Sequence, residues 1–144
     1  MIELERTRLM LENLGLAQAA LTLDSHLDYA ARSEITYLEF INRLLEDEVD
    51  FRRKRSEETR LKLSRLPQKK TLDDFDFSFQ PSIDERQIRE LATLSFIHRQ
   101  ENVILLGPPG VGKSHIAISL AVEAIRQGLS VYFVSMEKLL YDLR

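Results

Sequence analysis

The segment Gly107–Ser114, with the sequence GPPGVGKS, constrains the fold of this chain more than any other feature. It matches the pattern G-x-x-x-x-G-K-[ST] at every position, and it lies between a short apolar run, Val103–Leu106, and an amphipathic stretch that ends at Gly128. A buried strand, a glycine-rich turn and a helix in this order are the setting in which the pattern is a true P-loop. A second apolar run, Val131–Val134, and a further helical segment, Met136–Leu143, follow. We therefore expect a β–α–β unit with parallel strands.

The residue types of this segment suit the binding of a nucleotide phosphate. Glycines let the backbone turn tightly and point successive N–H groups inward, and the following helix adds its N-terminal amides and its dipole. Lys113 is expected to contact the β- and γ-phosphates, and the Ser114 hydroxyl is expected to be a ligand of Mg²⁺. The residues predicted to bind the nucleotide are Gly107, Pro108, Pro109, Gly110, Val111, Gly112, Lys113 and Ser114.

The sequence carries no visible machinery for hydrolysis. A P-loop NTPase also needs a Walker-B aspartate at the end of another strand, and often an arginine finger. No apolar run in this sequence ends in paired acids, and Glu137 follows the second run only at the start of a helix. Glu123 and Asp142 lie on expected helices, where a solvated surface role is the simpler interpretation. We therefore assign no catalytic residue.

The first 66 residues predict a helical module. Apolar residues recur there at helical spacing, and Gly15 is a plausible end of the first helix. The segment Thr36–Glu39 has the form of a capping box, which opens a helix that is expected to continue to Pro67. The apolar stripes of these helices are expected to pack on one another.

Residues 67–82 form an expected connector to a partial P-loop domain, residues 83–144. Phe75, Phe77 and Phe79 alternate along an acidic stretch, which favours an extended segment with one face packed on a domain. Stacking of these rings on a base is the alternative. A second capping-box pattern at Ser82–Glu85 predicts a helix that continues to Phe96.

Charge is distributed unevenly along the chain. The formal net charge is −3, yet the segment Arg52–Lys70 has nine basic residues against two acidic ones and carries +7. Such a run can contact the phosphates of duplex DNA without reading bases, or it can be a solvated helix face. The residues predicted to contact DNA are Arg52, Arg53, Lys54, Arg55, Arg60 and Lys62.

Composition excludes several classes of function. With no cysteine, the chain has neither disulfides nor thiol catalysis nor Cys-ligated zinc. His26, His98 and His115 have no metal-binding spacing, and His115 is expected on the surface of a helix. No apolar run approaches the roughly 20 residues that span a bilayer, and no secretory signal is visible, so a cytoplasmic protein without a membrane partner is expected.

Three segments together resemble the IstB family: Lys70–Phe77, Gln87–Leu94 and Glu101–His115. These are ATP-binding helper proteins of bacterial insertion sequences, close to the DnaC-type helicase loaders of the AAA+ class. The resemblance implies ATP binding, self-assembly into oligomers on duplex DNA through the helical module, and support of a partner transposase. It also implies a doubly wound parallel sheet of the P-loop NTPase type, in an α/β chain whose N-terminal module is all helical.

Family members continue through Walker B and arginine-finger segments, whereas the 144 residues end soon after the second expected strand. The sequence is therefore interpreted as an N-terminal portion of an IstB-like protein, and hydrolysis by it stays open. Two alternatives remain: a helicase loader of DnaC type, and a non-catalytic interaction fragment.

Overall fold

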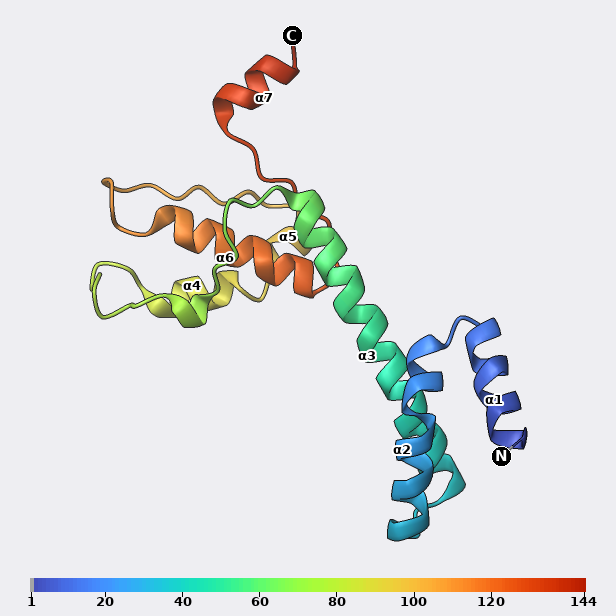
Figure 1. Cartoon of the computed structure of the whole chain (residues 1–144). Coiled ribbons are helices and arrows are strands. Elements are labelled where there is room, and N and C mark those ends of the chain that lie inside the picture. The colour runs from blue at the N-terminus through green and yellow to red at the C-terminus, as the bar shows by residue number, and fades with distance from the viewer. Residues whose placement is uncertain (1) are drawn as a thin grey trace. The chain divides into compact units, whose positions relative to one another are not determined.

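The computed structural model describes residues 2–144, and every regular element among them is a helix (Figure 1). The chain divides into two compact units, Met1–Ser56 and Glu57–Arg144. The elements are α1 (Ile2–Asn13), α2 (Ala17–Ser33), α3 (Tyr37–Ser64), the short 3₁₀ helix η1 (Leu72–Asp74), α4 (Glu85–Leu91), α5 (Ser95–His98), α6 (Lys113–Arg126) and α7 (Met136–Asp142).

The first unit is built on contacts between α2 and its neighbours. Ala19 and Leu23 of α2 and Leu44 of α3 form the buried cluster. Gly15, with a φ of +77°, reverses the chain after α1, as the sequence predicts. The partly buried residues that pack against this cluster are Leu4, Leu11, Leu16 and Phe40.

Helix α3 begins where the sequence predicts. The Oγ1 atom of Thr36 accepts a hydrogen bond from the Glu39 amide (3.1 Å), which satisfies one of the unpaired N–H groups of the first turn. The packing prediction for this helix is only partly right. Leu44 is buried, but four neighbours in the predicted stripe stay exposed, because only one side of α3 faces α2 in this unit. They are Leu38, Ile41, Leu45 and Val49.

Helix α6 lies at the centre of the second unit. Its Ile116 and Leu120 form a buried cluster with Ile88 of α4. Helix α4 begins after Asp84, whose carboxylate accepts from the Arg86 amide (2.9 Å), so the predicted cap at Ser82 is wrong by two positions. The predicted continuation to Phe96 is also wrong, because the backbone turns left-handed at Leu94 (φ +61°) and begins the separate helix α5.

The two predicted strands are not β-strands in the part of the chain that the structure describes. Val103 and Leu105 are partly buried, while Ile104 and Leu106 are 79% and 88% exposed. In the second run, the Phe133 amide donates to the carbonyl oxygen of Ser64 (2.7 Å). A strand exists only as part of a hydrogen-bonded ladder, and no ladder joins these two runs. The expected doubly wound parallel sheet is thus not seen, and it stays a prediction.

The last turns of α3 and the connector belong to the second unit. Arg60 donates from Nη1 to the carbonyl oxygen of Gly128 (3.3 Å), near the end of α6. The units meet inside α3, between Ser56 and Glu57, whereas the limits expected from the sequence at 66 and 82 stay predictions. No helix among residues 2–144 is long and apolar enough to cross a bilayer.

Candidate phosphate-binding site

The predicted phosphate loop leads directly into α6. Gly110 and Gly112 have φ values of +82° and +96°, a conformation that side-chain-bearing residues rarely adopt. Gly112 is the N-cap of α6, and Lys113 is the first residue of the helix. At Gly107 an added Cβ would lie 3.2 Å from Cγ2 of Val111, a tight contact with a side chain. The left-handed backbone therefore favours glycine at two positions of the pattern.

The start of α6 presents unpaired amides at this loop. The first intrahelical bond runs from the Ile116 amide to the carbonyl oxygen of Gly112 (3.0 Å). The amides of Lys113, Ser114 and His115 precede that bond and need partners from outside the helix. Together with the helix dipole, they suit an anion such as a phosphate group.

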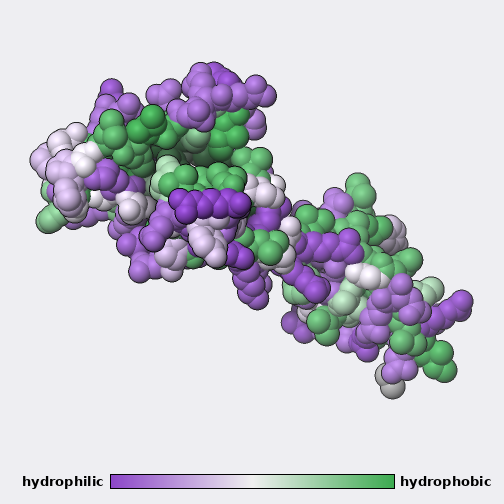
Figure 2. Space-filling model, turned by 90° about the horizontal axis from the view of Figure 1, so that it is seen from above, coloured by the Kyte–Doolittle hydropathy of each residue, from purple (hydrophilic) through white to green (hydrophobic). Residues whose placement is uncertain are grey.

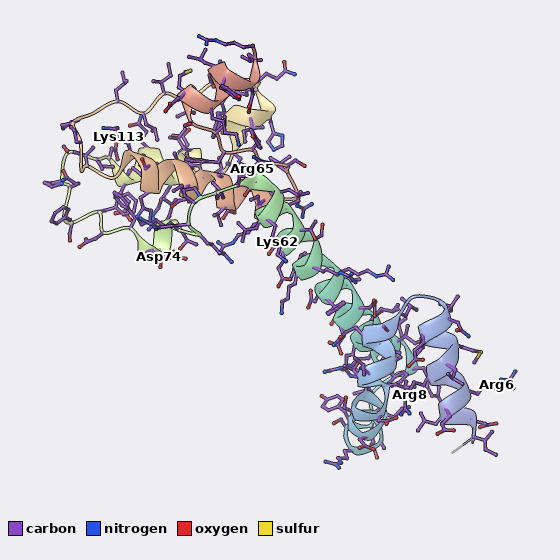
Figure 3. The ribbon with its side chains drawn as sticks, turned by 45° about the horizontal axis from the view of Figure 1, so that its top comes forward. Arg6, Arg8, Lys62, Arg65, Asp74 and Lys113 are labelled. Carbon is purple, nitrogen blue, oxygen red and sulfur yellow. The ribbon has the colours of Figure 1, made fainter. Side chains whose placement is uncertain are left out.

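The Lys113 ammonium lies against the loop it follows. Nζ donates to the carbonyl oxygen of Pro108 (2.8 Å) and to that of Gly107, so the side chain folds back over the loop. Figure 3 shows Lys113 at the beginning of α6. An ammonium has three donors, so a third can be directed to a ligand while these two bonds persist. The positive charge thus lies where a bound phosphate would need it.

The residues fit a phosphate better than they fit a metal ion alone. Ser114 is exposed in the first turn of α6, and its hydroxyl is one possible oxygen ligand for Mg²⁺. Among the described residues, no group of three or more His, Cys, Asp or Glu side chains could hold a metal. Mg²⁺ commonly keeps several waters and takes its remaining ligands from substrate phosphates. Ser114 is compatible with that mode of binding.

A cavity of about 510 Å³ adjoins the loop, bounded by Val111 and Lys113, by α4 and by residues 102–106. This volume lies within the range of small-ligand pockets, roughly 300–1,000 Å³. At its edge, Arg99 donates from Nε to a carboxylate oxygen of Glu101 (2.9 Å). That hydrogen bond lowers the pKa of Glu101, so the carboxylate stays ionised.

The connector packs against the phosphate loop, and sequence reasoning missed this contact. The rings of Phe75 and Phe77 meet edge to face, with centroids 4.8 Å apart, and both pack on the α4–α6 cluster. Phe79 is 75% exposed, so the prediction of one packed face holds for two of the three rings. The predicted extended conformation is wrong, because η1 and a turn at residues 77–79 coil the segment. His115 is not the surface residue that was expected: it is half-buried, and its Nε2 lies 2.9 Å from the carbonyl oxygen of Thr71.

Two of the six residues predicted to contact DNA donate hydrogen bonds to carbonyl oxygens of their own units. Arg52 donates from Nε to the buried carboxylate of Glu48 (3.2 Å) and from Nη2 to the carbonyl oxygen of Gly15 (2.9 Å). Arg60 bonds to the carbonyl oxygen of Gly128, and its buried Nε has no hydrogen-bond partner. These guanidinium groups therefore have structural roles that the charge pattern alone does not reveal.

The other four basic residues, like Arg52, are exposed on the surface of α3. Arg53 pairs with Asp50 (3.1 Å), and both side chains are more than half exposed. Lys54, Arg55 and Lys62 are exposed as well. Figure 3 shows Lys62 near the end of α3. The prediction of DNA contact thus keeps a structural basis at these four positions.

Comparison with known proteins identifies the family. Residues 8–144 match the family model described as IstB-like ATP binding protein. The chain belongs to this family. The match includes the helical first unit, the connector and the phosphate loop, and it supports an α/β P-loop class for the family domain.

Relatives of the IstB-like chain carry consistent names. A protein of Geobacillus stearothermophilus, named as an ATP-binding protein of insertion sequence IS5376, is 54% identical over 117 residues, which are 81% of this chain and 47% of the relative. A protein of Pseudomonas aeruginosa, named likewise for insertion sequence IS21, is 47% identical over 134 residues, 93% of this chain and 51% of the relative. This chain thus spans about half the length of these relatives.

Proposed function

We propose that this IstB-like chain binds ATP, with the triphosphate held by Gly107–Ser114 at the start of α6. The observation that carries the proposal is the geometry of the loop. Two glycines in left-handed conformation lead into a helix whose first three amides are unpaired within it, and the Lys113 ammonium lies across the same loop. The names of the relatives, which specify ATP binding in insertion sequences, agree with it.

Each group of the site would have a separate role. The loop and helix amides would hold phosphate oxygens, and Lys113 would neutralise charge on the β- and γ-phosphates. The Ser114 hydroxyl would be one ligand of Mg²⁺, with phosphate oxygens and water as the others. In the predicted parallel sheet, residues 103–106 would form the strand that leads into the phosphate loop and holds its first residue in place. No residue of this chain is assigned to hydrolysis.

The wider role that we propose is in DNA transposition. The chain would act in the cytoplasm on duplex DNA, as part of a self-assembled oligomer that supports a transposase. The exposed basic residues of α3 suit phosphate contacts that do not depend on base sequence. Exposed apolar residues of the first unit offer a surface for assembly, and they include Leu38, Ile41 and Leu45. Figure 2 shows hydrophobic residues in green on the surface of the molecule.

Calorimetric titration tests the site. Lys113→Ala removes charge-assisted hydrogen bonds to phosphate, each of which contributes about 1.5–3 kcal/mol, so affinity for Mg²⁺–ATP should fall by about tenfold or more. Lys138→Ala is the matched control, since it removes an exposed lysine of α7 in the same unit. Failure of the unmodified chain to bind ATP, or equal affinities of the Lys113 variant and the unmodified chain, would reject the proposal.

A further inference from the structure

The connector touches the phosphate loop at Gly112, the N-cap of α6. A Cβ built on Gly112 would lie 2.5 Å from Cε2 of Phe75 and 3.0 Å from its Cζ. No side chain fits between the Phe75 ring and the backbone at this point. The position of the ring and the path of the loop therefore depend on each other.

A second contact holds the connector to the first turn of the same helix. The Thr71 carbonyl oxygen can only accept, so the His115 ring must carry its proton on Nε2 to donate across 2.9 Å. The His115 ring also meets Phe75 edge to face, with centroids 5.1 Å apart at 88°. His115 immediately follows Ser114, and its own amide is one of the three unpaired at the helix start. Movement of this ring would thus move the backbone that faces the phosphate.

The connector is rigid at the point where it accepts from His115. The Asp74 carboxylate accepts from the Thr71 amide (3.1 Å) and from its hydroxyl (3.0 Å), which closes a capping box around η1. These two bonds lower the pKa of Asp74, so the carboxylate is ionised and remains an acceptor at neutral pH. Figure 3 shows Asp74 on this segment.

We propose that Thr71, Asp74, Phe75 and His115 form a connector latch that positions the phosphate loop for the triphosphate. The proposal rests on ATP binding at Gly107–Ser114. None of these four residues belongs to the predicted phosphate loop, Gly107–Ser114. Their proposed role is to position that loop. With the latch closed, Gly112 and the first turn of α6 keep the geometry that binds phosphate. With the latch open, the loop is less ordered and ATP affinity falls.

The coupling must act in both directions. If a closed latch favours ATP, bound ATP must favour the closed latch by the same factor. Binding of ATP would therefore favour the closed latch and so change the connector, which joins α3 to α4. Nucleotide binding would change the exposure of residues 71–77 without any direct contact between them and ATP.

Hydrogen exchange on the unmodified chain tests the reciprocal effect. Amides of residues 71–77 should exchange at least about fivefold more slowly with saturating Mg²⁺–ATP than without nucleotide. Amides of α2, which lies in the other unit, serve as the internal reference. Equal exchange of the connector with and without ATP would overturn the latch, while binding of ATP would still stand.

Variants of the latch test the forward effect by calorimetry with ATP and with inorganic triphosphate. His115→Leu removes the donor and Phe75→Leu removes the ring. Each variant should therefore bind ATP and inorganic triphosphate at least about fivefold more weakly than the unmodified chain does. His115→Gln supplies an N–H at similar reach and should keep an affinity close to that of the unmodified chain. Phe79→Ala, which changes an exposed ring of the same connector, should leave affinity unchanged.

The outcomes separate the latch from a purely structural role. Thermal unfolding of each variant is measured in parallel, and a variant with an unchanged melting temperature but weaker binding supports positioning. Affinities of His115→Leu and Phe75→Leu equal to that of Phe79→Ala would overturn the latch alone. Failure of the unmodified chain to bind either ligand would overturn the proposed function together with the latch.

Discussion

Replacement of Arg52 by alanine should destabilise the helical first unit before it affects any contact with DNA. Arg52 links two parts of that unit: it donates to the buried carboxylate of Glu48 on its own helix α3, and to the Gly15 carbonyl oxygen between α1 and α2. Glu48 in turn accepts from the Ala19 amide (3.0 Å), which is one of the unpaired donors at the start of α2. The side chain of Glu48 thereby caps α2 from another helix.

The expected loss of stability follows from these contacts. The side chain of Arg52 is 59% exposed, so its ion pair with Glu48 is screened and contributes about 0–1 kcal/mol. The bond to Gly15 contributes about 1 kcal/mol. The largest contribution to the loss of stability comes from Glu48. Its carboxylate is only 6% exposed, and losing one hydrogen-bond partner there costs about 1–3 kcal/mol. We expect a total of about 2–3 kcal/mol, because these contributions overlap.

Thermal unfolding followed by circular dichroism measures this effect. For a unit of this size the melting temperature should fall by about 4–8 °C per kcal/mol. Arg53→Ala is the matched control, since its pair with Asp50 is exposed and should contribute less than about 1 kcal/mol. Adding Glu48→Gln to the Arg52 variant should restore part of the loss, because a neutral amide is less costly to bury than a charged carboxylate.

DNA binding distinguishes the two roles of the basic segment. In a titration with duplex DNA at increasing salt, replacement of the exposed residues Lys54 and Lys62 together should lower affinity and flatten the salt dependence without changing the melting temperature. The reasoning would be refuted if Arg52→Ala unfolded at the temperature of the unmodified chain and lost DNA affinity as strongly as that double variant.

Two further predictions concern the phosphate loop and acid stability. Gly112→Ala should lower the free energy of unfolding by about 1–3 kcal/mol through backbone strain. Because its Cβ also displaces Phe75, the loss measured by chemical denaturation should exceed that of Gly110→Ala, whose Cβ meets nothing within 4 Å. Equal losses in the two variants would contradict this prediction. The hydrogen bond from His26 Nε2 (2.5 Å) lowers the pKa of Asp47 below its ordinary value of 3.8. The folded state therefore gains stability above about pH 4 that disappears as the pH falls through the lowered pKa. Asp47→Asn should be less stable than the unmodified chain at pH 6, and this difference should shrink as the pH falls through the lowered pKa. A stability difference that did not shrink on acidification would count against this assignment.

Features encoded within a few consecutive residues could be predicted from the sequence. The Thr36 cap, the turn at Gly15 and the passage from Gly112 into α6 each depend on contacts over at most one helical turn. The glycine pattern of the phosphate loop belongs to the same class, because the left-handed backbone that it requires is a local property. Even the errors at Ser82 and Leu94 are shifts of a boundary within a correctly predicted helical region.

Contacts between distant residues could not be predicted, and they determine what several polar side chains do. His115 and Thr71 are 44 positions apart, Arg52 and Gly15 are 37 apart, and Ala19 and Glu48 are 29 apart. Nothing in the local pattern marks these pairs. The sheet stays a prediction for the same reason, since β-propensity at residues 103–106 specifies an extended chain but not the neighbour that would complete a ladder.

The basic segment shows how the same charge pattern can support two different kinds of contact. A helix places every residue at a fixed angle to its neighbours, so a run of arginines and lysines cannot present all of its charges to one ligand. Arg52 and Arg60 each bond to a carbonyl oxygen of their own unit, so we expect DNA contacts from the other four predicted residues, all of which are exposed. A plot of the logarithm of DNA affinity against the logarithm of salt concentration has a slope of about −0.9 for each phosphate neutralised. Four contacts therefore give a slope of about −3.6, whereas six would give about −5.4. A measured slope as steep as the second value would mean that Arg52 and Arg60 exchange their carbonyl contacts for DNA phosphates, and that the first unit and the end of α6 rearrange with this exchange.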